Sequence, residues 1–259
     1  EPGGIPNSNS SANGLVLSLS QEQKDVISHR GNDLQIIACA GAGKTEAISR
    51  RVAALLAEGA PPESIIAFTF TEKAGAELKE RIYRRVSETA GVDVLDTLGP
   101  MFVGTIHGWC FHSLQERVPR YGDYEVIDEH RHAALLSRES QTLQLKELAH
   151  NNRHWAGVRE WIRIVDVVGN ELLEESALDE VALLDRYRQY IEILDRFRFL
   201  TFSRVISEAI RILEDPGLGP AMRGPLKYVI VDEYQDINPA QERLITLLAG
   251  DDAELCVVG

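Results

Sequence analysis

The feature that most constrains the fold of this chain is the segment at residues 36–51, IIACAGAGKTEAISRR. An apolar run of strand character passes through a turn of small residues, and a Lys-Thr pair then opens a helical pattern. A phosphate cradle has the spacing Gly, four residues, Gly-Lys-Ser/Thr. Gly43, Lys44 and Thr45 fit this spacing, whereas Ala38 stands where the first glycine is expected. The segment predicts either a nucleotide cradle or an ordinary glycine-rich turn.

The small residues of this turn suit phosphate binding, because backbone N–H groups ahead of a helix can surround phosphate oxygens and the helix dipole favours an anion. Lys44 is expected to reach the β- and γ-phosphates, and the hydroxyl of Thr45 is expected to ligate Mg²⁺. The predicted cradle consists of Ala40, Gly41, Ala42, Gly43, Lys44 and Thr45.

A second apolar run, YVIVDEYQD at residues 228–236, ends in acidic residues. Asp232 would place a hard oxygen ligand beside Mg²⁺, and Glu233 could polarise a water for in-line attack on the γ-phosphate. Two acids at the end of a surface strand are common, but their combination with a Lys-Thr cradle is not. The pair of segments predicts an ATP-hydrolysing site whose cofactors are ATP and Mg²⁺.

Strand and helix patterns alternate along the chain, with one interruption. We expect a disordered tail at residues 1–14, where Gly, Pro, Ser and Asn dominate. Alternating strands and helices occupy residues 15–119, amphipathic helices without strands occupy residues 120–199, and strand and helix return over residues 200–259. This order predicts an α/β fold that is interrupted by an all-helical inserted subdomain.

The alternating parts imply a parallel sheet with right-handed crossovers. Ligands bind to such sheets at the carboxyl ends of the strands. The GAGKT and DEYQD segments both follow apolar runs and therefore lie at these ends. Their predicted meeting at one edge of the sheet supports the nucleotide site more strongly than either segment alone.

Composition argues against several other classes of protein. No run approaches the ~18 apolar residues of a membrane span, and the first residues do not have the pattern of a secretory signal. Three widely spaced cysteines, and seven histidines without metal spacing, favour reduced thiols in a cytoplasmic protein that uses no membrane. The net charge of −13 argues against wrapping duplex DNA through bulk electrostatics, but it allows a local groove.

Four ordered segments resemble the first core motifs of superfamily 1 DNA helicases of the UvrD/Rep/PcrA type, namely ACAGAGKT, AFTFTEKAGAELKERI, VGTIHGWC and VIVDEYQD. The resemblance covers the chain from about residue 17 to its end, apart from the helical insert, and this family tolerates alanine at the first cradle position. It implies a RecA-like P-loop NTPase lobe from an ATP-dependent translocase or helicase that moves 3′–5′ on single-stranded DNA in repair, replication or recombination.

The resemblance also implies roles for individual residues at the nucleotide. Gln23, in LSLSQEQKDVI, resembles the amide that reads the edge of adenine, and Gln235 resembles a sensor of the γ-phosphate. The predicted catalytic residues are Lys44, Asp232, Glu233 and Gln235, and the predicted magnesium ligands are Thr45 and Asp232.

Four further residues resemble contacts to single-stranded DNA. Phe70 would stack on a base and Thr71 would lie near a phosphate, while Thr105 and His107 would contact the backbone. Stacking tolerates any base, which suits a translocating motor. A place in the core is the alternative for Phe70, and it is the favoured reading for Trp109.

The resemblance places a second RecA-like lobe, with its arginine fingers, after Gly259. The 259 residues alone are therefore expected to be almost inactive, and repair or recombination proteins are possible partners. Two residues beside the cradle depart from the family pattern. Glu46 stands where relatives often carry arginine, and Cys39 stands where they often carry glycine. The insert is also acidic: residues 119–199 contain 11 Lys or Arg and 16 Asp or Glu, a net charge of −5. This acidity argues against a strong grip on duplex DNA.

Two alternative functions remain open at this point. In a nucleotide-gated DNA-binding or regulatory module, ATP would order the protein without strand separation. A different P-loop enzyme, such as a kinase, is disfavoured because neither TFTEKA nor GTIHGWC has a role there.

Overall fold

The computed structural model describes residues 19–39, 41–149, 153–178 and 181–259. The tail expected at residues 1–14, and Ala40 of the predicted cradle, lie outside these ranges. The strands are β1 (Leu34–Ile36), β2 (Ile65–Thr69), β3 (Phe102–Thr105), β4 (Glu125–Val126), β5 (Phe199–Leu200), β6 (Tyr228–Val231) and β7 (Glu254–Val258). The helices are α1 (Gln21–Ser28), α2 (Lys44–Ala57), α3 (Glu72–Ala90), α4 (Ile106–Arg117), α5 (Glu129–Arg138), α6 (His154–Asn170), α7 (Val181–Phe197), α8 (Phe202–Glu214), α9 (Gly219–Arg223) and α10 (Pro239–Ala249).

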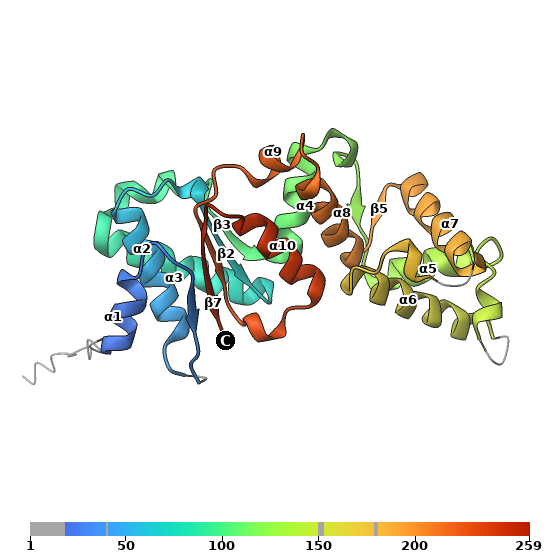
Figure 1. The fold of residues 1–259 in the computed structure, drawn as a ribbon, viewed down its shortest axis with the longest axis horizontal. Coiled ribbons are helices and arrows are strands. Elements are labelled where there is room, and N and C mark those ends of the chain that lie inside the picture. Colours follow the sequence, from blue (N-terminus) through green and yellow to red (C-terminus); the bar gives the residue numbers. More distant parts are fainter. Residues whose placement is uncertain (1–18, 40, 150–152, 179–180) are drawn as a thin grey trace, which may run out of the picture.

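Five strands form a parallel sheet in the order β1-β7-β6-β2-β3 (Figure 1). The structure therefore confirms the expected α/β fold with a parallel sheet. The first strand is shorter than the run LQIIACA suggests, because it ends at Ile36. Two backbone bonds then continue its pairing with the end of the chain, from Gly259 N–H to the Ile36 carbonyl and from Ala38 N–H to the Gly259 carbonyl.

Successive residues of the central strands point to opposite faces of the sheet, as the two-residue period of a strand requires. On one face Ile65 and Ile230 pack with apolar residues of α2 and α3. On the other face Ile66 and Val229 pack with residues of α4, α8 and α10. The central strands are thus buried on both sides, which explains why their sequences read as continuous apolar runs.

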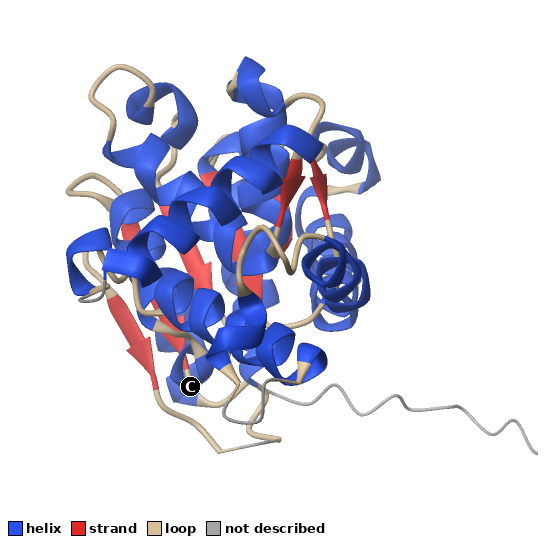
Figure 2. Ribbon diagram, turned by 90° about the vertical axis from the view of Figure 1, so that its right-hand side faces the viewer, coloured by secondary structure: helices blue, strands red, loops and turns tan. Residues whose placement is uncertain are grey.

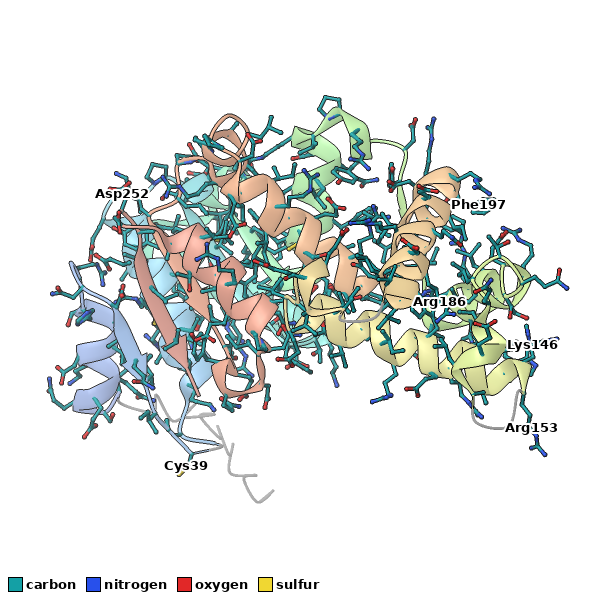
Figure 3. The ribbon with its side chains drawn as sticks, turned by 45° about the vertical axis from the view of Figure 1, so that its right-hand side comes forward. Cys39, Lys146, Arg153, Arg186, Phe197 and Asp252 are labelled. Atoms are coloured by element: carbon teal, nitrogen blue, oxygen red, sulfur yellow. The ribbon has the colours of Figure 1, made fainter. Side chains whose placement is uncertain are left out.

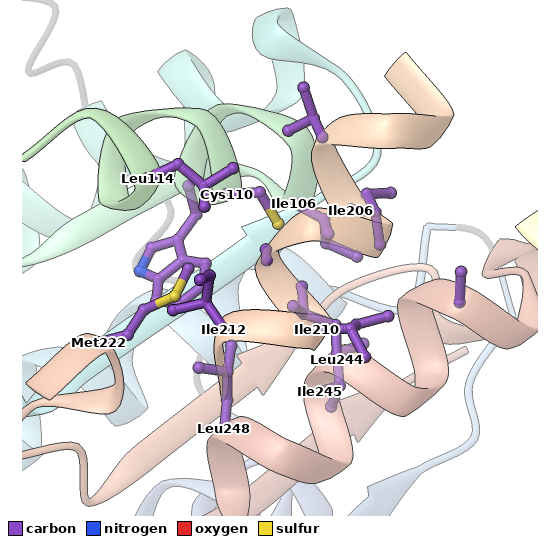
Figure 4. Packing of buried hydrophobic residues seen from close by; sticks show 14 of the residues in the cluster. Ile106, Cys110, Leu114, Ile206, Ile210, Ile212, Met222, Leu244, Ile245 and Leu248 are labelled. Carbon is purple, nitrogen blue, oxygen red and sulfur yellow. The ribbon is translucent and has the colours of Figure 1, made fainter. Parts of the chain in front are cut away.

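Helix α8 lies between α4 and α10 and joins two parts of the chain that are far apart in sequence (Figure 4). Its Ile206 and Ile210 share one cluster with Cys110 of α4 and Leu244 of α10. Trp109, 6% exposed, belongs to the same cluster, so its expected core role is confirmed. This packing fixes the segment after the insert onto the sheet that carries the predicted nucleotide site.

Helices α5, α6 and α7 form a second body beside the sheet, with a core of its own around the fully buried Trp161 (Figures 1 and 2). The expectation that residues 120–199 contain no strand is wrong in one respect. The two connections between this insert and the lobe run side by side, and β4 pairs with β5 in parallel. The pairing satisfies backbone groups at the junction, and two-residue strands are too short to show a sequence period.

The buried His132 of α5 makes the stability of the insert depend on pH. Its Nε2 lies 2.9 Å from the Tyr190 hydroxyl, and burial lowers the pKa of His132 to about 4. The fold therefore favours neutral imidazole, so its contribution is complete above the unfolded pKa of about 6.5 and is lost as pH falls towards 4.

We expect the free energy of unfolding to fall by up to about 3 kcal/mol between pH 6.5 and pH 4 because His132 must become protonated. Urea unfolding of the wild type and of His132→Phe at these pH values would measure how steeply the free energy of unfolding changes with pH in each protein. This slope should be smaller in His132→Phe. His130→Phe, at the exposed position two residues earlier, is the matched control and should keep the wild-type slope. Equal slopes for wild type and His132→Phe would contradict the assignment.

No helix within the described ranges combines the length and the apolarity that a membrane crossing needs.

Candidate nucleotide site and single-strand groove

The predicted cradle lies at the carboxyl end of β1, where α2 begins. Gly43 precedes the helix at φ 84°, and Gly41 has φ 82°. Both angles fall in the left-handed region that favours glycine. Ala42 N–H donates to the Cys39 carbonyl at 3.1 Å and closes the turn between strand and helix. Cys39 itself is exposed at the tip of this connection (Figure 3).

Gln23 of α1 lies on the cradle rather than free in solvent. Its Nε2 donates to the Ala42 carbonyl at 3.2 Å, and its Oε1 accepts from Ser20 N–H at 3.1 Å in the capping box of α1. A Cβ at position 43 would stand 2.6 Å from this Nε2. The backbone angle favours glycine at position 43, and the amide of Gln23 lies close against it and links α1 to the turn.

The acidic segment meets the cradle from β6. Asp232 N–H donates to the Phe68 carbonyl at 2.9 Å, which fixes this residue at the end of the strand. Glu233 has φ 54°, and its Oε2 lies 3.6 Å from Lys44 Nζ and accepts from Gln235 Nε2 at 2.7 Å. Glu233 therefore contacts two other predicted catalytic side chains, its near neighbour Gln235 and Lys44, which lies about 190 residues earlier in the chain.

Burial raises the pKa of Asp232, and the neighbouring Glu233 carboxylate raises it further, against the opposing effects of Glu233 N–H and of Lys44. A carboxyl group in this environment gains from a nearby cation. A cation bound beside the partly buried Asp232 would therefore favour its ionised form.

The described residues fit a magnesium nucleotide. No heavy atom lies within 4 Å of a Cβ added at Gly41, so the turn leaves open space on that side. No group of three His, Cys, Asp or Glu side chains that could hold a metal occurs in the described ranges. Mg²⁺ usually binds through one or two protein oxygens and takes its other ligands from water and phosphate. Thr45 and Asp232 would hold the ion, and Lys44 would hold the phosphates. Bound Mg²⁺ neutralises charge on the phosphate oxygens.

Glu46, the departure beside the cradle, is held between two helices. Its Oε1 pairs with Arg50 Nε at 2.5 Å and with Arg85 Nη2 of α3 at 2.7 Å. Burial alone would raise the pKa of Glu46, but the two guanidinium groups outweigh burial and lower it. The carboxylate therefore braces α2 against α3.

A groove with a volume of about 500 Å³ opens beside this site, between the ends of β2 and β3 and the start of α8. Phe70 lines it with 59% of its surface exposed, so the alternative that this aromatic belongs to the core is wrong. Phe202, 50% exposed, lines the same groove. Two exposed aromatic rings in one groove are the arrangement on which unstacked bases can pack.

The other predicted DNA contacts, Thr71, Thr105 and His107, also line this groove. The two threonine hydroxyls already make hydrogen bonds within the protein. Thr71 caps α3 by accepting from Ala74 N–H at 3.1 Å. Thr105 is buried, accepts from Gly108 N–H at 3.1 Å and donates to Glu72 Oε1 at 2.6 Å. Burial lowers the pKa of His107, against the opposing charge of Glu72. Burial therefore favours the neutral imidazole at the groove.

Sequence reasoning missed Phe202. Its ring packs edge-on against His107, with 5.5 Å between ring centroids. The available signal was weak: an aromatic directly after the Thr201 cap, at the first position of α8. A small cavity of about 110 Å³ reaches from Phe70 and His107 to Asp232, so the groove and the acidic segment share a wall.

Comparison with known families decides the relationship that these features suggest. The family model of the UvrD/REP helicase N-terminal domain matches residues 19–259. The chain belongs to this family. The UvrD/REP match spans the sheet, the insert and both acidic and glycine-rich segments, and it confirms the resemblance that the four motifs indicate.

Curated relatives agree. ATP-dependent DNA helicase UvrD1 of Mycobacterium leprae is 32% identical, covering 95% of this chain and 33% of the relative. ATP-dependent DNA helicase PcrA of Staphylococcus epidermidis is 30% identical, and DNA helicase II of Escherichia coli is 29% identical, with 95% of this chain and 34% of the relative covered in each case. The chain spans about a third of the length of the UvrD/REP relatives it matches.

Proposed function

We propose that this chain is the ATP-binding first lobe of an ATP-dependent translocase or helicase that moves 3′–5′ on single-stranded DNA. The observation that carries the proposal is one edge of the sheet, where Glu233 pairs with Lys44 and a small cavity leads from the neighbouring Asp232 to Phe70, which lines the groove together with Phe202. A nucleotide site and a base-stacking groove that share a wall allow each ligand to influence the other.

In this proposal each residue has one task. Lys44 holds the phosphates, Thr45 and Asp232 hold Mg²⁺, and Glu233 accepts a proton from the attacking water. In the structure Lys44 pairs with Glu233. Phosphates that take over Lys44 would release the Glu233 carboxylate for this task, while Gln235, bonded to the same carboxylate, would register the change.

The proposal places a second RecA-like lobe and the arginine finger outside these 259 residues. The relatives are about three times as long, and the arginines on α2 are engaged: Arg50 with Glu46, and Arg51 with Glu254. A finger supplies about 10³–10⁵ in turnover, so we expect these residues alone to hydrolyse ATP near background. Three free cysteines support a cytoplasmic location, and we propose a role in repair, replication or recombination with partner proteins of those processes.

Phe70→Ala tests the DNA half of the proposal in the protein with both lobes. Losing a stacked base should weaken single-strand binding by about 1–3 kcal/mol and blunt the stimulation of ATPase by DNA, while DNA-free turnover and thermal unfolding stay unchanged because the ring is exposed. Fluorescence anisotropy with a labelled oligonucleotide and a coupled ATPase assay measure these effects.

Trp155→Ala is the matched control, since Trp155 is an aromatic of similar exposure, 57%, outside the groove. An equal loss of binding in both variants would argue against the groove. A wild-type protein whose ATP turnover does not respond to bound single strand would instead favour the nucleotide-gated binding module.

A further inference from the structure

Helix α1 carries Gln23 to the cradle but is not held there by a hydrophobic face. None of its eight residues is buried. A helix this short is marginal on its own, and burial of apolar residues is the usual source of helix docking. Its apolar Val26 and Ile27 are only partly buried, so the position of α1 depends largely on polar contacts to the rest of the lobe.

The strongest of these contacts comes from Arg51 of α2, which is 1% exposed. Its Nη1 donates to the Val26 carbonyl at 2.9 Å and to the His29 carbonyl at 2.5 Å. The last carbonyls of a helix lack partners within the helix, and these two belong to the end of α1. The guanidinium therefore serves as a C-terminal cap that a different helix supplies.

The same guanidinium is anchored to the sheet. Arg51 Nη2 donates to Glu254 Oε2 at 3.1 Å, at the first residue of β7. The other oxygen of Glu254 accepts from Gly31 N–H at 2.5 Å, in the connection between α1 and β1. One carboxylate and one guanidinium thus fix both the end of α1 and the chain that leaves it.

A second contact on the outer side is weaker. Arg30 Nη1 donates to the Ile27 and His29 carbonyls at 2.7 and 2.6 Å. Arg30 also pairs with Glu58 at 2.8 Å, but the Glu58 side chain is 59% exposed. Exposed pairs contribute little because water competes for both partners. Arg51, by contrast, lies on the apolar face of α2 with Ile48, Val52 and Leu55, and its buried Nε has no partner among the described residues.

Burying a guanidinium in this way is costly, and an apolar residue of similar volume often leaves stability unchanged or improves it. Packing alone would therefore not require arginine at this position. The contacts that only arginine makes are those to the end of α1 and to Glu254. Arg51 and Lys44 also share α2, so a single helix holds both the phosphate contact and the anchor of Gln23.

We propose that Arg51 is a positioning residue that holds α1, and with it Gln23, in the place from which Gln23 recognises the nucleotide base. Arg51 would thereby determine the preference for adenine without touching the nucleotide. The inference rests on the proposed nucleotide site and adds the residue that controls its base selectivity. Releasing the end of α1 would leave the cradle intact but would remove Gln23 from a fixed place beside it.

The test compares wild type, Arg51→Met and Lys44→Ala for binding of Mg-ATP and Mg-UTP, which share phosphates and ribose and differ in the base. Wild type should prefer ATP. Arg51→Met should lose about 5- to 10-fold in ATP affinity, the value of one hydrogen bond to the base, and keep its UTP affinity, whereas Lys44→Ala should lose both. Amide hydrogen exchange of α1 should become faster in Arg51→Met and stay unchanged in Arg84→Met, a matched exposed arginine on α3.

Each alternative outcome is decisive. An unchanged ATP-to-UTP ratio, or unchanged exchange in α1, in folded Arg51→Met would overturn the inference while leaving the cradle standing. Equal affinity of the wild type for ATP and UTP would also overturn the inference without affecting the cradle. Wild type that binds neither would overturn the proposed function, and the inference with it. If Arg51→Met does not fold, Glu254→Gln removes the charge of the anchor at constant size and should show both effects in the same direction. Their absence in that variant would equally refute the role of Arg51.

Discussion

Replacing Glu233 by Gln in the protein with both lobes is expected to lower DNA-stimulated ATP turnover by about 10²–10⁴-fold, the usual contribution of a general base. Glutamine keeps the size of the side chain and can still accept from Gln235 Nε2, but it removes basicity. Glu233 also pairs with Lys44 at 3.6 Å. Because the neutral amide competes less for Lys44, ATP affinity should be unchanged or higher, and single-strand binding should be unchanged.

Steady-state turnover and equilibrium binding of ATP separate these effects, because a loss in turnover without a loss in binding marks a transition-state contribution. Glu242→Gln is the control: this carboxylate lies on α10, near the same segment, and accepts from the Tyr234 hydroxyl at 3.3 Å. It should retain wild-type turnover. Turnover within a factor of two or so of wild type in Glu233→Gln would assign the base to another group.

Lys44→Ala is expected to abolish measurable binding of Mg-ATP. The Lys44 side chain is only 14% exposed, and a charge pair at about 4 Å near a protein surface is worth up to about 4 kcal/mol. The loss exceeds a hundredfold in affinity. The variant also leaves Glu233 without its cation beside the phosphates, which adds repulsion.

Titration calorimetry with Mg-ATP measures this effect. Wild-type binding by these 259 residues should itself be weak, because the proposal assigns half of the site to the second lobe. Lys79→Ala, an exposed lysine on α3 whose ammonium lies over the Tyr83 ring, should bind as wild type does. Equal affinity of wild type and Lys44→Ala would refute the assignment of the cradle.

Local sequence was sufficient for features that lie within one strand, turn or helix. The run from β1 through Gly43 to Lys44 is continuous, so its sequence predicted a strand, a glycine-rich turn and a helix. The central strands read as apolar runs because both of their faces are covered. Leu78, Ile82 and Val86 lie four residues apart in the sequence, and this helical spacing forms the buried face of α3. Arg51 could have been noticed too, since it lies between Ile48 and Leu55 on the apolar stripe of α2.

Tertiary structure decided the relations between distant segments. Phe70 and Phe202 become two walls of one groove only because α8 returns from the insert to pack between α4 and α10. The β4–β5 pair and the contact of Arg51 with the end of α1 likewise join segments that no sequence period connects. A local pattern records which face of an element is apolar, and that face can be covered by many partners. Which partner covers it depends on the packing of the whole chain. The sequence therefore determined the elements and the glycine-rich turn, and the packed fold determined which side chains meet.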